Sequence, residues 1–254
     1  MTHLEKLKEK YNIKNFSLTN VQIPETTFND ETVVLSDETL RERKEKLLNK
    51  MKEKGLDLVI IYADKEHGSN FEYFTGFIPR FEEALLAIEL SGSAKLFLGN
   101  ENLRLARFSR IKAEAVHIPH FSLPNQPMAN EKSFKELMRE ALDFTNKKIG
   151  VAGWKVFTSS HDNNEQFYDV PYFIVETLKE LAQEYSASIV NCANILNGEK
   201  EGIRTINNAD EIRYYEFGSS LASDCVLDAM NHIELGKTET ELGTYLSRFG
   251  QPHS

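Results

Sequence analysis

The sequence predicts an α/β protein in which a mixed β-sheet is flanked by helices. Residues 56–62, LDLVIIY, are apolar and β-branched and follow Gly55, as expected of a strand buried on both faces of a parallel sheet. Residues 83–90 and 95–99 are two strand-like runs separated by the short turn SGSA, which predicts a β-hairpin. A buried strand of the parallel type beside an antiparallel hairpin makes the sheet mixed.

Helices alternate with these strands along the chain. Ser36 is a typical N-cap residue followed by two acidic residues, and the apolar spacing from Leu40 to Met51 predicts a helix that ends before Gly55. Further along we expect a short helix at 101–110, a strand at 113–118 and a proline-rich loop at 119–127. Two helix–strand units follow, the first at 131–145 with 148–153 and the second at 171–185 with 186–192.

The character of the sequence changes at both ends of this α/β pattern. Residues 1–35 predict a short charged helix and then an extended arm, because periodicity is lost around Pro24. After residue 200, capping boxes at Asn208 and Thr238 predict two helices, with Gly236 closing the first, and no predicted strand covers their apolar stripes. The predicted domains are therefore 1–35, 36–200 and 201–254.

Composition excludes several classes of protein. The hydrophobic share of 41% and charged share of 27% are those of a globular domain, and the net charge of −9 disfavours binding to nucleic acid. No apolar stretch is long enough to span a membrane, and the charged start MTHLEKLKEK is unlike a secretion signal, so we expect a cytoplasmic protein. Cys192 and Cys225 are expected to be reduced thiols without a catalytic role.

The familiar catalytic motifs do not occur in the sequence. There is no H-E-x-x-H, G-x-S-x-G, Walker loop or G-x-G-x-x-G. His117 and His120 form the closest histidine pair, but a third ligand is not nearby, and strand-end histidines without a metal are the simpler interpretation. We therefore assign no catalytic residue and no metal ligand.

One aromatic segment between two predicted strands fits either a packed turn of the core or a binding surface. It is NFEYFTGF at 70–77. Together with GLDLVIIY before it and Arg80, EEALLAIE and LFLGNEN after it, the segment resembles the amino-terminal domain of the creatinase, prolidase and aminopeptidase P family. GIRTINNADEIRYYEFGSSLASDCVLDAM and LGKTETELGTYL are similar to the entry of that family's pita-bread catalytic domain. The resemblance implies a ribonuclease H-like domain followed by an incomplete α+β pita-bread domain.

The resemblance also implies a chemistry for a full-length parent protein. Members of the family are two-metal hydrolases in which manganese, cobalt or zinc ions activate a water and polarise the scissile carbonyl, often before a proline. Their ligands, two aspartates, a histidine and two glutamates, would fall after the two helices predicted here. This chain is therefore expected to lack cofactors and to be inactive alone, as the truncated part of a parent that cleaves proline-containing peptides.

The role implied for the amino-terminal domain is to support a homodimer and to cover part of an active site. Tyr73, Phe74 and Arg80 are predicted to border a neighbouring active site in such a dimer, although core packing is the competing interpretation of the two aromatic residues. His253 is added to this set because it lies closest to the segment that would carry the ligands.

Two other functions stay open at this point. The chain could be a stand-alone dimerisation or regulatory module that has lost its catalytic half. It could also be a generic α/β ligand-binding domain, which would require a pocket at the carboxyl ends of the parallel strands.

Overall fold

A computed structural model of the chain describes residues 3–10, 20, 22, 33–126, 128, 132–200 and 202–246. The chain divides into two compact units. One unit comprises Val34–Tyr214 and holds the whole β-sheet, and the other comprises residues 1–33 and 215–254.

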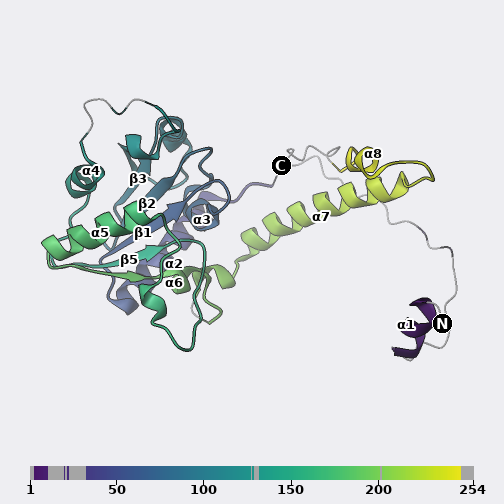
Figure 1. Ribbon diagram of the computed structural model, residues 1–254, viewed down its shortest axis with the longest axis horizontal. Helices are drawn as coiled ribbons and strands as arrows, with labels where there is room; N and C mark the ends of the chain where they lie inside the picture. The colour runs from purple at the N-terminus through teal and green to yellow at the C-terminus, as the bar shows by residue number, and fades with distance from the viewer. Residues whose placement is uncertain are drawn as a thin grey trace. The chain divides into compact units, whose positions relative to one another are not determined.

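The sheet of the first unit has six strands in the order β4-β3-β2-β1-β5-β6 (Figure 1). β2 is antiparallel to both of its neighbours, whereas the pairs β1 with β5, β3 with β4, and β5 with β6 are parallel. The prediction of a mixed sheet is confirmed. The strands are β1 (Leu58–Ala63), β2 (Ala84–Glu89), β3 (Ala94–Leu98), β4 (Glu114–His117), β5 (Lys148–Ala152) and β6 (Ser188–Asn191).

Helices cover both faces of this sheet and create two apolar layers. The labelled helices lie about the sheet in Figure 1. Val59 and Ile61 of β1 belong to the core that contains α2, α3 and α6, and Leu58 and Ile60 belong to the core that contains α4 and α5. The alternation follows from the two-residue period of a strand. These helices are α2 (Asp37–Lys54), α3 (Ser69–Thr75), α4 (Phe134–Ala141), α5 (Tyr172–Glu184) and α6 (Ala193–Asn197).

The predicted limits of α2 are confirmed. The Ser36 hydroxyl accepts a hydrogen bond from the Thr39 backbone N–H at 3.2 Å, which satisfies one of the free donors at the helix start. Gly55 ends the helix with a φ of 63°, a left-handed conformation that glycine adopts without steric cost.

Several elements differ from the prediction. The helix predicted at 131–145 is shorter, because Leu142 turns to extended backbone at φ −127° and ψ 141° after α4. The predicted loop at 119–127 begins with a 3₁₀ turn at Pro119–Phe121, and the short helix predicted at 101–110 is also 3₁₀ (Leu103–Phe108). Two short helices, α3 and α6, were not predicted, and neither were the 3₁₀ turns at Asn164–Gln166 and Ile203–Thr205.

The helices predicted after residue 200 form, with different ends. α7 (Ala209–Asn231) begins after Asn208 and α8 (Glu239–Gly243) begins with the predicted capping box of Thr238 and Glu241. The prediction that Gly236 closes α7 is wrong. α7 ends at Asn231, and the next residue, His232, places its ring Nδ1 2.7 Å from the Asp228 carbonyl oxygen of the last turn.

The remaining terminal predictions are only partly covered by the described residues. The charged helix at the start forms as α1 (His3–Lys10), whereas most of the predicted arm and Phe249 of the second helix lie outside the described residues. Where the structure describes the chain, none of its helices has the length and apolar character that crossing a bilayer requires.

The contribution of buried aromatic side chains in the sheet core to stability can be tested by substitution. Phe97 in β3 is fully buried, so Phe97→Ala is expected to lower the free energy of unfolding by about 3–5 kcal/mol in urea denaturation. Phe108 has a 56% exposed side chain, and the matched change Phe108→Ala should cost less than about 1 kcal/mol. Equal losses in the two variants would contradict the core described here.

Candidate functional site

The aromatic segment predicted to border an active site forms the short helix α3. Thr75 at its end donates a hydroxyl hydrogen bond to the Phe71 carbonyl at 3.0 Å, and Gly76 terminates the helix with a φ of 77°. The Tyr73 and Phe74 side chains are 5% and 0% exposed and meet edge to face with ring centroids 5.1 Å apart. Both rings are therefore core residues of this chain.

The other two predicted border residues lie elsewhere. Arg80 is exposed and its guanidinium lies 5.1 Å from the centroid of the Phe81 ring. Its backbone N–H donates to the Asn102 side-chain oxygen at 2.9 Å. Arg80 thus contacts the loops that flank β2 and β3, and His253 lies outside the described residues. A border with a neighbouring active site stays a prediction for all four residues.

Tyr73 lies at a polar junction between the α/β core and the first turn of α7. The Arg43 guanidinium of α2 stacks over the Tyr73 ring at 4.1 Å, and the Arg204 guanidinium lies 5.4 Å from the same centroid. The Tyr73 hydroxyl donates to the Ile203 carbonyl at 3.4 Å. The Tyr73 backbone carbonyl accepts from Arg43 Nη1 at 2.9 Å.

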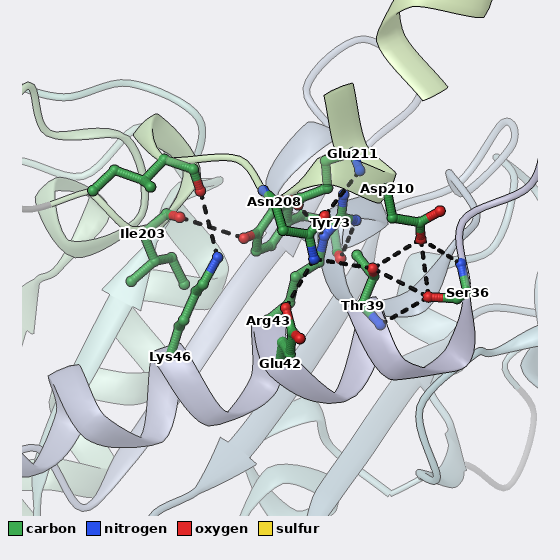
Figure 2. Close-up of polar contacts among 11 residues, drawn as sticks. Ser36, Thr39, Glu42, Arg43, Lys46, Tyr73, Ile203, Asn208, Asp210 and Glu211 are labelled. Atoms are coloured by element: carbon green, nitrogen blue, oxygen red, sulfur yellow. Dashed lines mark hydrogen bonds and ion pairs between the residues drawn. The ribbon is translucent and has the colours of Figure 1, made fainter. Parts of the chain in front are cut away.

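A buried ion pair lies at the centre of this junction (Figure 2). Arg43 Nε is 2.8 Å from Glu211 Oε1, and the two side chains are only 5% and 1% exposed. The Asn208 backbone N–H donates to Glu211 Oε2 at 2.8 Å, so each carboxylate oxygen has its own donor. A charge buried this deeply is stable only when it is paired and hydrogen bonded.

Two more side chains connect the start of α7 to α2 (Figure 2). Asn208 donates through Nδ2 to Glu42 Oε2 at 2.8 Å and to Thr39 Oγ1 at 3.1 Å. Asp210 Oδ2 accepts from Ser36 N at 2.8 Å, from Ser36 Oγ at 2.9 Å and from Thr39 Oγ1 at 2.8 Å. The Asp210 carboxylate therefore lies at the amino end of α2, where the helix dipole favours a negative charge.

Arg204 connects the same chain segment to α3. Its Nη1 donates to Asn70 Oδ1 at 2.5 Å and to Asn197 Oδ1 at 3.1 Å. Asn70 is fully buried and donates through Nδ2 to the Gly153 carbonyl at 2.7 Å. Arg204 thus connects its segment to α3 and α6, and Asn70 continues the contact to Gly153 just after β5.

A second feature is a pocket of about 450 Å³ at the carboxyl end of β1, lined in part by Tyr62, Asp64, Glu82, Glu83 and His120. Burial raises the pKa of Glu83 and, with the neighbouring Asp64 carboxylate, that of Tyr62. Although burial acts in the opposite direction, hydrogen bonds from the His67 ring and backbone hold the pKa of Asp64 below its usual value. The pocket lies where a ligand-binding α/β domain would need one.

The metal ligands implied by the family can be sought among the residues present. In the described parts of the chain, no three histidine, cysteine, aspartate or glutamate side chains gather closely enough to hold an ion. His117 Nε2 lies 2.6 Å from Asn100 Oδ1, and the His120 ring packs 5.7 Å from the Phe134 ring. These side chains do not fit a two-metal centre, and no metal-dependent step is assigned to them.

The two cysteines are free thiols in buried positions. Complete burial raises the pKa of Cys192 to about 12, so the reactive thiolate is scarce near neutral pH. Cys192 instead fills space beside β5, where a Cβ placed at Gly150 would come within 2.6 Å of its sulfur.

Asp210 predicts a pH-dependent stability. Hydrogen bonds from the Ser36 backbone N–H and the Thr39 and Ser36 hydroxyls hold the pKa of Asp210 below its usual value. Such a carboxylate stabilises the fold above its unfolded pKa of about 3.9, and the contribution is lost as the pH falls through the folded-state pKa. Asp210→Asn should therefore lower the urea midpoint near neutral pH.

The difference in urea midpoint between Asp210→Asn and the unchanged protein should become smaller as the pH is lowered from about 7 to about 3. Glu45→Gln removes an exposed acid from α2, the helix whose amino end Asp210 contacts, and serves as the control, with a small difference at every pH. A difference for Asp210→Asn that is constant across the range would contradict the role of its carboxylate.

The fold is similar to that of solved prolidases. The prolidase from Pyrococcus furiosus aligns with a TM-score of 0.54 and 20% identity over 81% of this chain and 51% of its own. The prolidase from Pyrococcus horikoshii aligns with a TM-score of 0.55 and 19% identity over 82% of this chain and 48% of its own. The Xaa-Pro dipeptidase from Bacillus anthracis aligns with a TM-score of 0.52 and 13% identity over 83% of this chain and 48% of its own. At these identities the likeness concerns the fold, and the chain spans about half the length of each enzyme.

Sequence comparison identifies the family directly. No curated protein sequence matches the chain. The profile described as the Creatinase/Prolidase N-terminal domain matches residues 43–198, a span that contains the sheet and its five covering helices apart from the first six residues of α2. Because this match covers more than half of the 254 residues, the chain belongs to the creatinase/prolidase N-terminal domain family.

Proposed function

We propose that the chain is the non-catalytic amino-terminal portion of a prolidase-like two-metal hydrolase that cleaves Xaa-Pro peptides. The family match over residues 43–198 is the observation that carries this proposal. The proposed task of the α/β domain is to support a homodimer in the cytoplasm and to cover part of an active site whose metal ligands come from another domain.

The surface of α7 supports the presence of a further packing partner. Its predicted apolar stripe is largely exposed, with Ile212 at 56%, Val226 at 51% and Met230 at 57%. An amphipathic helix normally buries such a stripe against a second layer of structure. Polypeptide of the catalytic domain would supply that layer under this proposal.

Peptidase assays test the expected lack of activity. Purified chain incubated with manganese, cobalt or zinc and Xaa-Pro dipeptides should release no more proline than metal and peptide without protein. Hydrolysis that increases with the amount of chain and is abolished by a chelator would contradict the proposal, because the described residues provide no donor set for the ions.

Light scattering tests the proposed dimer. A homodimer has twice the 29.1 kDa mass of one chain, and that mass should persist on dilution if the dimer is stable. A mass of one chain at every concentration would contradict a dimerisation role while leaving the peptidase assay unaffected.

A stand-alone dimerisation or regulatory module is the alternative within the same family. The two proposals differ in the coding DNA beyond codon 254. An in-frame continuation that encodes two aspartates, a histidine and two glutamates in ligand positions would favour the hydrolase. A natural stop codon there would favour the module.

The pocket at the carboxyl end of β1 favours one candidate function of another class, a ligand-binding α/β domain. Its acidic lining suits a small cationic ligand. A thermal-shift series with primary amines and guanidines tests this function, and Asp64→Asn should remove any shift that originates in the pocket. The absence of any shift across the series would dismiss it.

A further inference from the structure

We propose that Arg43 and Glu211 are a positioning pair that locks the first turn of α7 onto α2 and α3. The α/β domain then unfolds as one cooperative unit that includes the first turn of α7 through Tyr214. This inference does not depend on the hydrolase proposal, because it concerns contacts within the unit Val34–Tyr214.

Burial of both charges carries the first step. Arg43 and Glu211 are 5% and 1% exposed in their side chains and lie 2.8 Å apart. If the first turn of α7 moved away, the Arg43 guanidinium would remain among buried groups without its carboxylate. Loss of one partner of a buried pair is strongly unfavourable, so the turn and α2 stay together.

The same carboxylate also starts α7. Glu211 Oε2 accepts from the Asn208 backbone N–H at 2.8 Å, and the Asn208 side chain accepts from the Glu211 backbone N–H at 2.9 Å. This reciprocal arrangement is a capping box. Because Arg43 orients the Glu211 carboxylate, the pairing of α2 with α7 and the capping of α7 depend on one side chain.

Tyr73 connects α3 to the ion pair of Arg43 and Glu211. Arg43 stacks over the Tyr73 ring at 4.1 Å and donates to the Tyr73 carbonyl at 2.9 Å, and it still directs Nε to Glu211. One guanidinium thus connects α2, which carries it, to α3 and to the first turn of α7. A lysine has a single ammonium group and lacks the planar fork that makes these contacts at once.

Hydrogen exchange of the whole chain, followed by mass spectrometry, tests the pair. In the unchanged protein the amides of Ile212, Arg213 and Tyr214 should exchange slowly, like those of α2. Arg43→Met and Glu211→Gln should each accelerate exchange in that turn by at least about tenfold, with little change in β1 and β5. Arg43→Lys should give a partial loss of protection.

Arg41→Met is the matched control on the same helix. Arg41 pairs with Glu38 at the surface, where the side chains are 66% and 62% exposed, so its removal should leave exchange in the first turn of α7 unchanged.

Three results would overturn the proposal. One is rapid exchange of residues 212–214 in the unchanged protein, because no lock would then exist. Another is acceleration of equal size in β1, β5 and α7, since the pair would then support general stability alone. Failure of both Arg43→Met and Glu211→Gln to fold has the same meaning, because the pair would hold the whole domain.

Discussion

The complete burial of β1 is the constraint on which the rest of the fold depends. All six residues of the strand are buried, so each face of the sheet must be covered by apolar side chains from helices. The α2, α3 and α6 layer covers one face and the α4 and α5 layer covers the other. The position of α3 follows from this need, and with it the position of Tyr73 beside α2.

The sequence was sufficient to predict the elements whose signals are local. α2 carries its own N-cap, apolar stripe and terminal glycine, and the hairpin of β2 and β3 carries its own turn. α3 lacks such signals, because its seven residues are too few to show a helical period and three of them are aromatic core residues. Its burial comes from the sheet beneath it.

The junction at Arg43 could not be predicted from the sequence for a different reason. Arg43 lies in a run of lysines, arginines and glutamates that is typical of a solvated helix face. Its spacing of three residues from Leu40 and four from Leu47 places it on the apolar face, which distinguishes it from Arg41 but does not identify a partner. Its partner Glu211 is 168 residues away. Only the folded chain brings the two together, which is why a residue that looks like a surface cation is 4% exposed.

Charge at this junction gives directional specificity that apolar packing would lack. Two leucines can pack in several registers, but the Glu211 carboxylate requires Arg43 Nε at one oxygen and the Asn208 backbone N–H at the other. A shift of α7 by one residue would turn the carboxylate away from both donors by about 100°. The first turn of α7 therefore has one favourable position on the α/β core, because any other position would leave a buried charge without its donors.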